Sequence, residues 1–142
     1  MLYNAAGFSC QMDTKMTDVN ALELFESWNA ALQTGSPDEV VKLYDASAIL
    51  LPTVSDRVRH NHEEIRDYFV GFLAKQPSGT IDESNVKRIG DVLVHAGVYT
   101  FQFGNGDTVQ ARFTYVHQHI DGEWKIIQHH SSQMPEGLVP AS

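Results

Sequence analysis

Two imidazoles and two hydroxyls follow one another near the end of the chain, at His129, His130, Ser131 and Ser132. They come directly after an apolar segment, 124–127, which predicts that all of them lie on one β-strand. Because strand side chains alternate between faces, His129 and Ser131 share one side and His130 and Ser132 the other. Such groups suit the wall of a pocket that moves protons or holds a small polar ligand. The residues themselves leave open which pair faces a pocket, and also the alternative of a solvated strand end.

Helices are predicted before this strand, and they have to form the rest of such a pocket. Apolar residues at three- and four-residue spacing predict a helix that starts at Thr17 or Asp18 and ends before Gly35. The segment 36–39 predicts a short second helix, with Ser36 as its cap and Glu39 reaching back. A capping box of Asn61 and Glu64 opens a third, strongly amphipathic helix. The apolar stripe of this third helix is Ile65, Tyr68, Phe69, Phe72 and Leu73.

Extended segments make up the remainder. A short strand, 48–51, is stopped by Pro52, and Thr53 follows where the chain leaves the core. Four longer strands are predicted at 81–89, 92–103, 109–119 and 123–132, with hairpin signals at Asn105-Gly106 and Asp121-Gly122. This order predicts an α+β fold, in which three N-terminal helices pack on a curved, mainly antiparallel sheet to form a cone with a pocket inside. Strands that are apolar on both faces in places, as at 92–94, predict a homodimer or a larger homo-oligomer.

Length and charge restrict the possible partners. The chain has 142 residues, enough for a single domain, which we place at 17–135 between a flexible arm, 1–16, and a tail, 136–142. A formal net charge of -8 argues against nucleic acid and anionic membrane surfaces as partners. The single cysteine, Cys10, excludes an internal disulfide framework. The start has no pattern of a secretory signal, so we expect a cytoplasmic protein.

Several segments together resemble a known family. They are 28–32 (WNAAL), 50–53 (LLPT), 64–69 (EIRDYF), 97–101 (GVYTF), 111–116 (ARFTYV) and 129–135 (HHSSQMP). In this order and spacing they look like the nuclear transport factor 2-like cone fold, in the branch named for the association domain of calcium/calmodulin-dependent protein kinase II. More narrowly, the chain resembles the iota-class carbonic anhydrases, and the closing His-His-Ser-Ser-x-Met-Pro is the most specific piece.

The narrower resemblance implies reversible hydration of carbon dioxide to bicarbonate. In the metal-free type of this class, a Thr, a Tyr and a Ser in a largely apolar pocket hold the bicarbonate and the attacking water. The matching residues are Thr53, Tyr68 and a serine of the closing motif. We choose Ser131, with His129 beside it to accept or pass a proton, because the association domain of the kinase has a pocket-facing arginine at the position that matches Ser131. The expected catalytic residues are therefore Thr53, Tyr68, Ser131 and His129, with no cofactor.

Other possibilities stay open on the sequence. Some members of the resembled class use zinc or manganese, and the pairs His60-x-His62 and His117-x-His119 have a spacing that zinc can use. We expect these four to be solvated surface histidines instead. The protein is alternatively a non-catalytic oligomerising or small-carboxylate-binding module, or a cone-fold isomerase or cyclase. An isomerase or cyclase needs a carboxylate base in the pocket. The best candidates for this base are Glu64 and Asp67, and both are expected to be solvated.

Overall fold

The structure is a computed structural model, and it describes residues 21–136. Within them, residues 21–33 are helical and are followed by α2 (Pro37–Val41) and α3 (His62–Leu73). The strands are β1 (Tyr44–Leu51), β2 (Ser78–Ile89), β3 (Val92–Gln102), β4 (Thr108–Ile120) and β5 (Glu123–Gln133). The predicted arm, Cys10, the helix start at Thr17 or Asp18 and nearly all of the tail lie outside the described residues.

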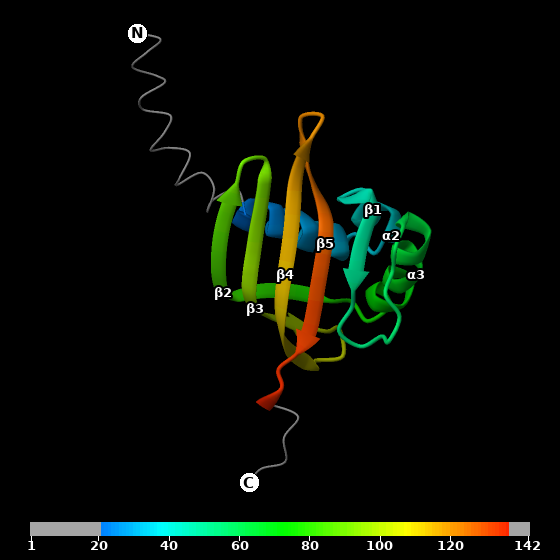
Figure 1. Ribbon diagram of the computed structural model, residues 1–142. Coiled ribbons are helices and arrows are strands. Elements are labelled where there is room, and N and C mark those ends of the chain that lie inside the picture. The colour runs from blue at the N-terminus through cyan, green and yellow to red at the C-terminus, as the bar shows by residue number, and fades with distance from the viewer. Residues whose placement is uncertain (1–20, 137–142) are drawn as a thin grey trace.

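The five strands form a single sheet in the order β1-β5-β4-β3-β2 (Figure 1). The pairs β2–β3, β3–β4 and β4–β5 are antiparallel, as the long meander predicts. The first strand differs from the prediction, because β1 begins four residues before Ala48 and pairs parallel with β5. Leu50 of β1 lies opposite His129, and this pairing places the exit of β1 next to the polar end of the last strand.

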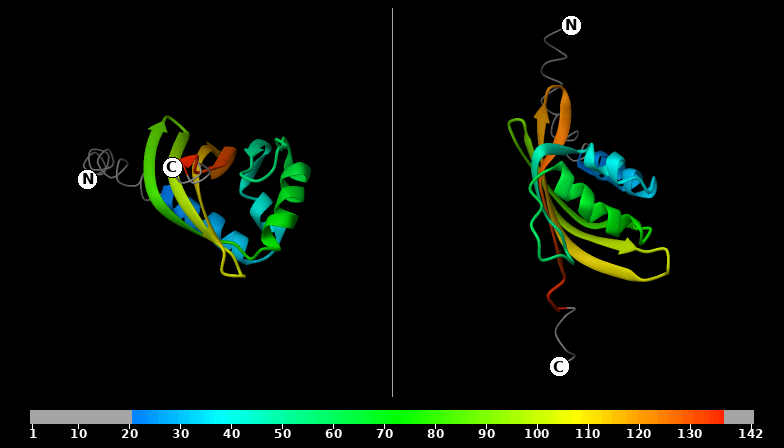
Figure 2. Two further views of the ribbon diagram at one scale, coloured as in Figure 1. Left: turned by 90° about the horizontal axis from the view of Figure 1, so that it is seen from below. Right: turned by 90° about the vertical axis from the view of Figure 1, so that its right-hand side faces the viewer.

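The helices lie on one side of the sheet, and the sheet curls around them (Figure 2). In the right-hand view the yellow hairpin between β3 and β4 curves beneath α3, which gives the molecule the expected cone shape. The core between the two layers is strongly aromatic and includes Phe25, Trp28, Phe69, Tyr99 and Tyr115. The predicted α+β cone is therefore confirmed.

The helix starts follow the predicted sequence signals only in part. The Asn61 side chain accepts a hydrogen bond from the Glu64 N–H at 2.9 Å, as expected. The reciprocal bond differs from a capping box, in which the Glu64 carboxylate would accept from the backbone N–H of Asn61. Here it accepts from the backbone N–H of His60, one residue earlier, and it also lies 3.0 Å from the His60 ring nitrogen Nδ1. At α2, Ser36 occupies the cap position, but its side chain makes no capping bond within the described residues. Glu39 there pairs with Lys42 instead of reaching back.

Two glycine positions explain the shape of the meander. The turn between β4 and β5 has positive φ at both Asp121 (52°) and Gly122 (83°), as a two-residue hairpin requires. Gly97 pairs with Ser84, next to a register shift in β2 between Ile81 and Glu83, and a Cβ added there would lie 1.9 Å from the Glu83 carbonyl oxygen. A close approach of this kind accepts only glycine, and it marks the point where β2 bends with the sheet. No helix within residues 21–136 is long and apolar enough to cross a membrane.

Candidate functional site

A cavity of about 800 Å³ lies between α3 and the concave face of the sheet. Its wall is largely aromatic and consists of Trp28, Tyr68, Phe69, Phe72, Phe101 and Phe103. Four polar side chains of the lining are joined by hydrogen bonds, namely Thr53, Tyr99, His129 and Ser131. Further polar residues of the lining are Gln76, Asn105, Asp107, Thr108 and Gln133. Lys75 also lines the cavity, and its ammonium lies 5.8 Å from the centre of the Phe103 ring. A cavity of this composition is suited to a mostly apolar molecule with an oxygen-bearing end.

The polar part is formed where β1 ends beside β5. Thr53 follows Pro52 at the exit of β1, and its hydroxyl makes a short hydrogen bond with the Ser131 hydroxyl of β5. His129 and Ser131 are buried on the concave face, whereas His130 is exposed and Ser132 half-buried on the other side. The alternation thus places the predicted pair, His129 and Ser131, at the cavity. Three of the four predicted site residues lie together there.

His129 is enclosed by aromatic side chains. The Tyr44 hydroxyl lies 2.8 Å from its Nδ1 and the Tyr99 hydroxyl 3.2 Å from its Nε2. Tyr115 stacks on the ring with centroids 4.1 Å apart. Burial, together with the nearby imidazole of His117, lowers the pKa of His129 to about 3. The ring is therefore neutral at physiological pH, and each of its nitrogens already has a hydroxyl partner.

Sequence reasoning missed Tyr44 and Tyr99. Tyr99 donates a 2.7 Å hydrogen bond to Ser131, so it joins the histidine to the Thr53–Ser131 pair. Its position was detectable, because alternation along β3 places Tyr99 on the same face as Phe101. Tyr44 is the first residue of β1, four residues before the start of the predicted strand. No local signal marked its hydroxyl as a partner of a histidine 85 residues away.

Tyr68, the fourth predicted residue, lines the same cavity from α3. Its ring stacks on Phe72 with centroids 5.7 Å apart, and the Arg59 guanidinium lies 5.6 Å from its centre. Burial raises its pKa to about 12, although the Arg59 charge acts in the opposite direction. The Tyr68 hydroxyl makes no hydrogen bond to another of the residues that the structure describes. It is a protonated donor available to a molecule in the cavity.

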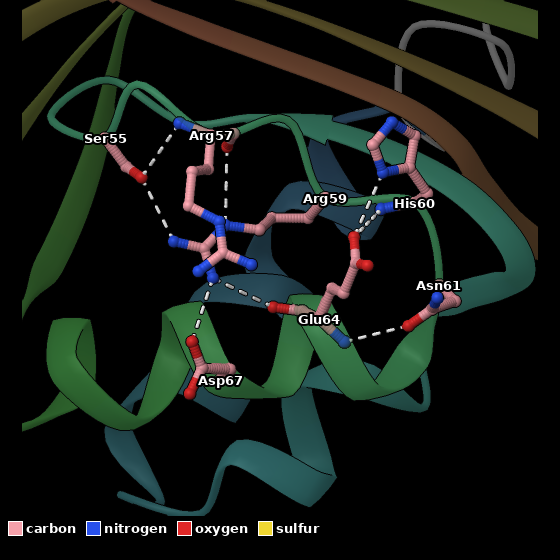
Figure 3. Close-up of polar contacts among 7 residues, drawn as sticks. All are labelled: Ser55, Arg57, Arg59, His60, Asn61, Glu64 and Asp67. Atoms are coloured by element: carbon pink, nitrogen blue, oxygen red, sulfur yellow. Dashed lines mark hydrogen bonds and ion pairs between the residues drawn. The ribbon is translucent and has the colours of Figure 1, made fainter.

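Arg59 fixes the loop that carries Thr53 (Figure 3). Its guanidinium is buried and donates to the Glu64 carbonyl, the Asp67 carboxylate and the Ser55 hydroxyl at 3.0–3.2 Å. Its backbone forms an isolated bridge with Leu50 through two 2.9 Å hydrogen bonds. The loop is therefore tied to both β1 and α3, and this restricts where Thr53 and Tyr68 lie relative to each other.

The comparison with protein families decides the broader identity of this fold. The family model described as the calcium/calmodulin dependent protein kinase II association domain matches residues 17–135. The chain belongs to this family. A crystal structure of a candidate association domain of the same kind, from Xanthomonas campestris, is 49% identical. The two structures align with a TM-score of 0.80, and the alignment covers 82% of this chain and 87% of the Xanthomonas chain. The comparison with curated proteins gives no match.

Two more distant structures share the fold of this association domain. A candidate ketosteroid isomerase from Parabacteroides distasonis is 20% identical, with a TM-score of 0.67 over 81% of this chain and 86% of that one. A candidate dehydratase of the NTF2-like family from Streptomyces avermitilis is 18% identical, with a TM-score of 0.70 over 86% and 97% of the two chains. At this identity they show the cone fold alone. The same cone hosts different chemistries, so function has to be argued from the cavity.

The histidine pairs lie outside the cavity lining of the association domain. His60 is exposed beside Glu64, and His62 Nε2 bonds the Tyr44 carbonyl oxygen at 2.7 Å. His60 and His119 are exposed as predicted, but the prediction was wrong for His62, which is half-buried, and for His117, which is only 4% exposed. His117 follows the regular alternation of β4 after Phe113 and Tyr115, so its ring lies on the concave side, against Tyr115.

The cavity does not suit a divalent cation. His129 is the one imidazole in the lining formed by residues 21–136, and both of its nitrogens are engaged by tyrosines. Asp107 is the one carboxylate of that described lining, and it lies exposed on the β3–β4 hairpin. Across the part of the chain that the structure describes, no three His, Cys, Asp or Glu side chains converge as metal ligands do.

Proposed function

We propose that this association domain hydrates carbon dioxide reversibly to bicarbonate, with the chemistry at the Thr53–Ser131 end of the cavity. The observation that carries the proposal is a pair of linked hydroxyls, from a loop and from β5, at the polar end of a mainly aromatic cavity. Carbon dioxide is small and apolar and therefore partitions into such a wall. Its oxygens need hydrogen-bond donors only as negative charge grows on them, and donors held in place before the reaction supply this stabilisation.

The reaction is the addition of water to carbon dioxide. A water oxygen attacks the carbon, one C=O π bond breaks, and its electron pair becomes the negative charge on a bicarbonate oxygen. Thr53 donates to that oxygen, and Tyr68, a protonated phenol on the opposite wall, orients the attacking water or the product. The proton lost by the water passes to further water and leaves through the open side of the cavity. His129 has no free nitrogen for this transfer, and we assign it to holding Tyr99 and thereby Ser131.

No step in this proposal passes through a metal, because the groups at the Thr53–Ser131 end of the cavity are hydroxyls, and both nitrogens of the nearby His129 ring are engaged by tyrosines. We therefore expect hydration activity to survive extensive treatment with chelators. Activity that disappears on chelation and returns with zinc or manganese would contradict the metal-free reaction. It would leave the substrate assignment intact.

The test is a stopped-flow carbon dioxide hydration assay on chelator-treated protein and three single variants, Thr53→Val, Tyr68→Phe and Ser131→Ala. We expect each variant to lose activity by at least about tenfold while it keeps its fold, because removing one positioned donor costs roughly 10²-fold or more in comparable sites. Ser132→Ala is the matched control: it removes the neighbouring hydroxyl on the other face of β5 and should leave the rate unchanged. Three fully active variants would overturn the assignment.

One observation favours a second function, the binding of an organic carboxylate. A cavity of about 800 Å³ is far larger than carbon dioxide requires and falls in the range of drug-sized ligands. The aromatic wall suits a ring, the hydroxyl end suits a carboxylate, and Lys75 adds a positive charge to the lining. Titration with benzoate, followed by protein NMR, tests this function. Binding of benzoate by a protein without hydration activity would replace the first proposal by the second.

An isomerase or cyclase is less well supported. Such an enzyme needs a carboxylate base inside its cavity. Glu64 and Asp67 line a separate shallow hollow with Arg57 and Arg66. The Asp67 side chain is 71% exposed and pairs with Arg59. It is therefore solvated and lies outside the cavity, which makes it unsuitable as the base.

We also propose that the protein is a homo-oligomer that associates through the outer face of its sheet. On this face β3 carries Val92, Val94 and Val98, and β4 carries Val116 opposite Val94, all only partly covered within one chain. Apolar rows of this kind on a sheet without a covering layer are typical of subunit contacts. Light scattering should give a mass of at least two chains for the wild type and a smaller mass for Val94→Glu. A monomeric wild type would contradict the proposal.

A further inference from the structure

One continuous line of hydrogen bonds runs from the first helix to the cavity. It links six side chains in the order Trp28, Tyr44, His129, Tyr99, Ser131 and Thr53. They come from the helix at 21–33, β1, β5, β3, β5 again and the loop after β1. All but Thr53 are buried. A buried chain of this type has a direction, because each hydroxyl donates one proton and the donors have to be shared among the acceptors.

The direction is set at the Trp28 end. The indole N–H can only donate, and it lies 3.1 Å from the Tyr44 oxygen, which therefore accepts. The phenolic proton of Tyr44, a residue only 1% exposed, is then left to donate to His129 Nδ1 at 2.8 Å. In the opposite arrangement, a proton on Nδ1 would point at Tyr44, and the Tyr44 proton would lack an acceptor among the described residues. Leaving a buried donor without a partner costs about 1–3 kcal/mol, so the first arrangement is favoured.

The same direction continues to the cavity. With Nδ1 as acceptor, the neutral ring carries its proton on Nε2 and donates it to Tyr99. Tyr99 donates to Ser131, and the Ser131 hydroxyl donates to Thr53. The Thr53 proton is the last in the line. Since its oxygen already accepts from Ser131, this proton is available to a molecule in the cavity that Thr53 lines.

We propose that Trp28, Tyr44, His129 and Tyr99 are positioning residues that fix the direction of this line, so that Thr53 presents a donor and the cavity selects an oxyanion. The inference rests on the proposed function for the identity of that oxyanion, bicarbonate. The reverse direction would turn the Thr53 oxygen into an acceptor and favour a ligand that donates, such as an alcohol or an ammonium group. The indole at the far end of the line thus decides the class of ligand at the near end.

The first measurement is made on the wild-type protein. In the full-length protein labelled with ¹⁵N-histidine, NMR distinguishes an Nε2–H from an Nδ1–H ring, with the His129 signals assigned through a His129→Asn variant. We expect His129 to be neutral with its proton on Nε2. A proton on Nδ1 in the wild type would overturn the proposal.

The second measurement compares two buried tyrosines that contact the same ring. Tyr44→Phe removes the donor to Nδ1, so we expect a mixture of the two ring forms and about fivefold weaker binding of ¹³C-bicarbonate. Tyr115→Phe is the control: the stack on His129 is kept, and the Tyr115 hydroxyl makes no hydrogen bond within residues 21–136. Equal bicarbonate affinity in wild type and Tyr44→Phe would refute the inference. If Tyr44→Phe changes both the His129 ring form and the bicarbonate affinity, but the wild type does not hydrate carbon dioxide, only the proposed reaction is refuted.

Discussion

Three buried imidazoles should make the stability of this domain depend steeply on pH. His95, His117 and His129 are at most 4% exposed on the concave side of the sheet. Burial lowers the pKa of His95 and of His117 from 6.5 to about 4, and that of His129 to about 3. All three are thus neutral in the folded state, whereas in the unfolded chain they regain ordinary values and bind protons below about pH 6.5. The free energy of unfolding therefore falls as the pH falls below 6.5.

The size of the effect follows from linkage. One pH unit below the unfolded pKa, each imidazole that stays neutral in the fold costs about 1.4 kcal/mol of stability. Three of them lower the free energy of unfolding by about 4 kcal/mol between about pH 7.5 and pH 5.5. This is a large share of the roughly 5–15 kcal/mol that holds a typical domain together. Asp45 contributes little in this window: hydrogen bonds from Ser47 lower its pKa below the ordinary value of 3.8, so the stability that this carboxylate adds is lost only below about pH 4.

Urea denaturation followed by tryptophan fluorescence at these two pH values measures the difference. His117→Leu removes one of the three groups and should lose only about two thirds as much stability over the same interval. His119→Gln, at an exposed position two residues further along β4, should behave like the wild type. Equal free energies of unfolding at both pH values in the wild type would refute the argument that these rings are buried and neutral.

Two further predictions concern the backbone. Gly97→Ala should destabilise the domain by about 2 kcal/mol or more, because the new Cβ meets the Glu83 carbonyl. Gly71→Ala, in open space on α3, should stabilise the domain by about 0.5–1 kcal/mol. Thermal unfolding of both variants checks the contrast, and an unchanged stability of Gly97→Ala would contradict it. Asn61→Ala should cost about 1 kcal/mol in urea denaturation through loss of the cap on α3, and Ser36→Ala, which removes no capping bond of the described residues, should cost less than about 0.5 kcal/mol. Equal costs for the two caps would show that the Asn61 bond does not stabilise α3.

The candidate site was predictable to the extent that it follows from alternation along one strand. The pairing of His129 with Ser131 on one face depends only on the two-residue period, and the position of Thr53 depends on Pro52 ending β1. The family resemblance, not the spacing, selected the Ser131 face. The resemblance also selected Thr53 and Tyr68 as site residues; the apolar stripe of α3 predicts only that Tyr68 faces the sheet.

The sequence by itself determined the order of the elements, the hairpins and the side of each strand that faces the core, because these depend on neighbouring residues. Only the tertiary structure decided that Tyr44 and Tyr99 enclose His129 and that β1 runs parallel to β5. The physical reason is the same in each case. These contacts join residues far apart in the chain, and their geometry is set by how two layers pack together, which no local pattern of residues encodes.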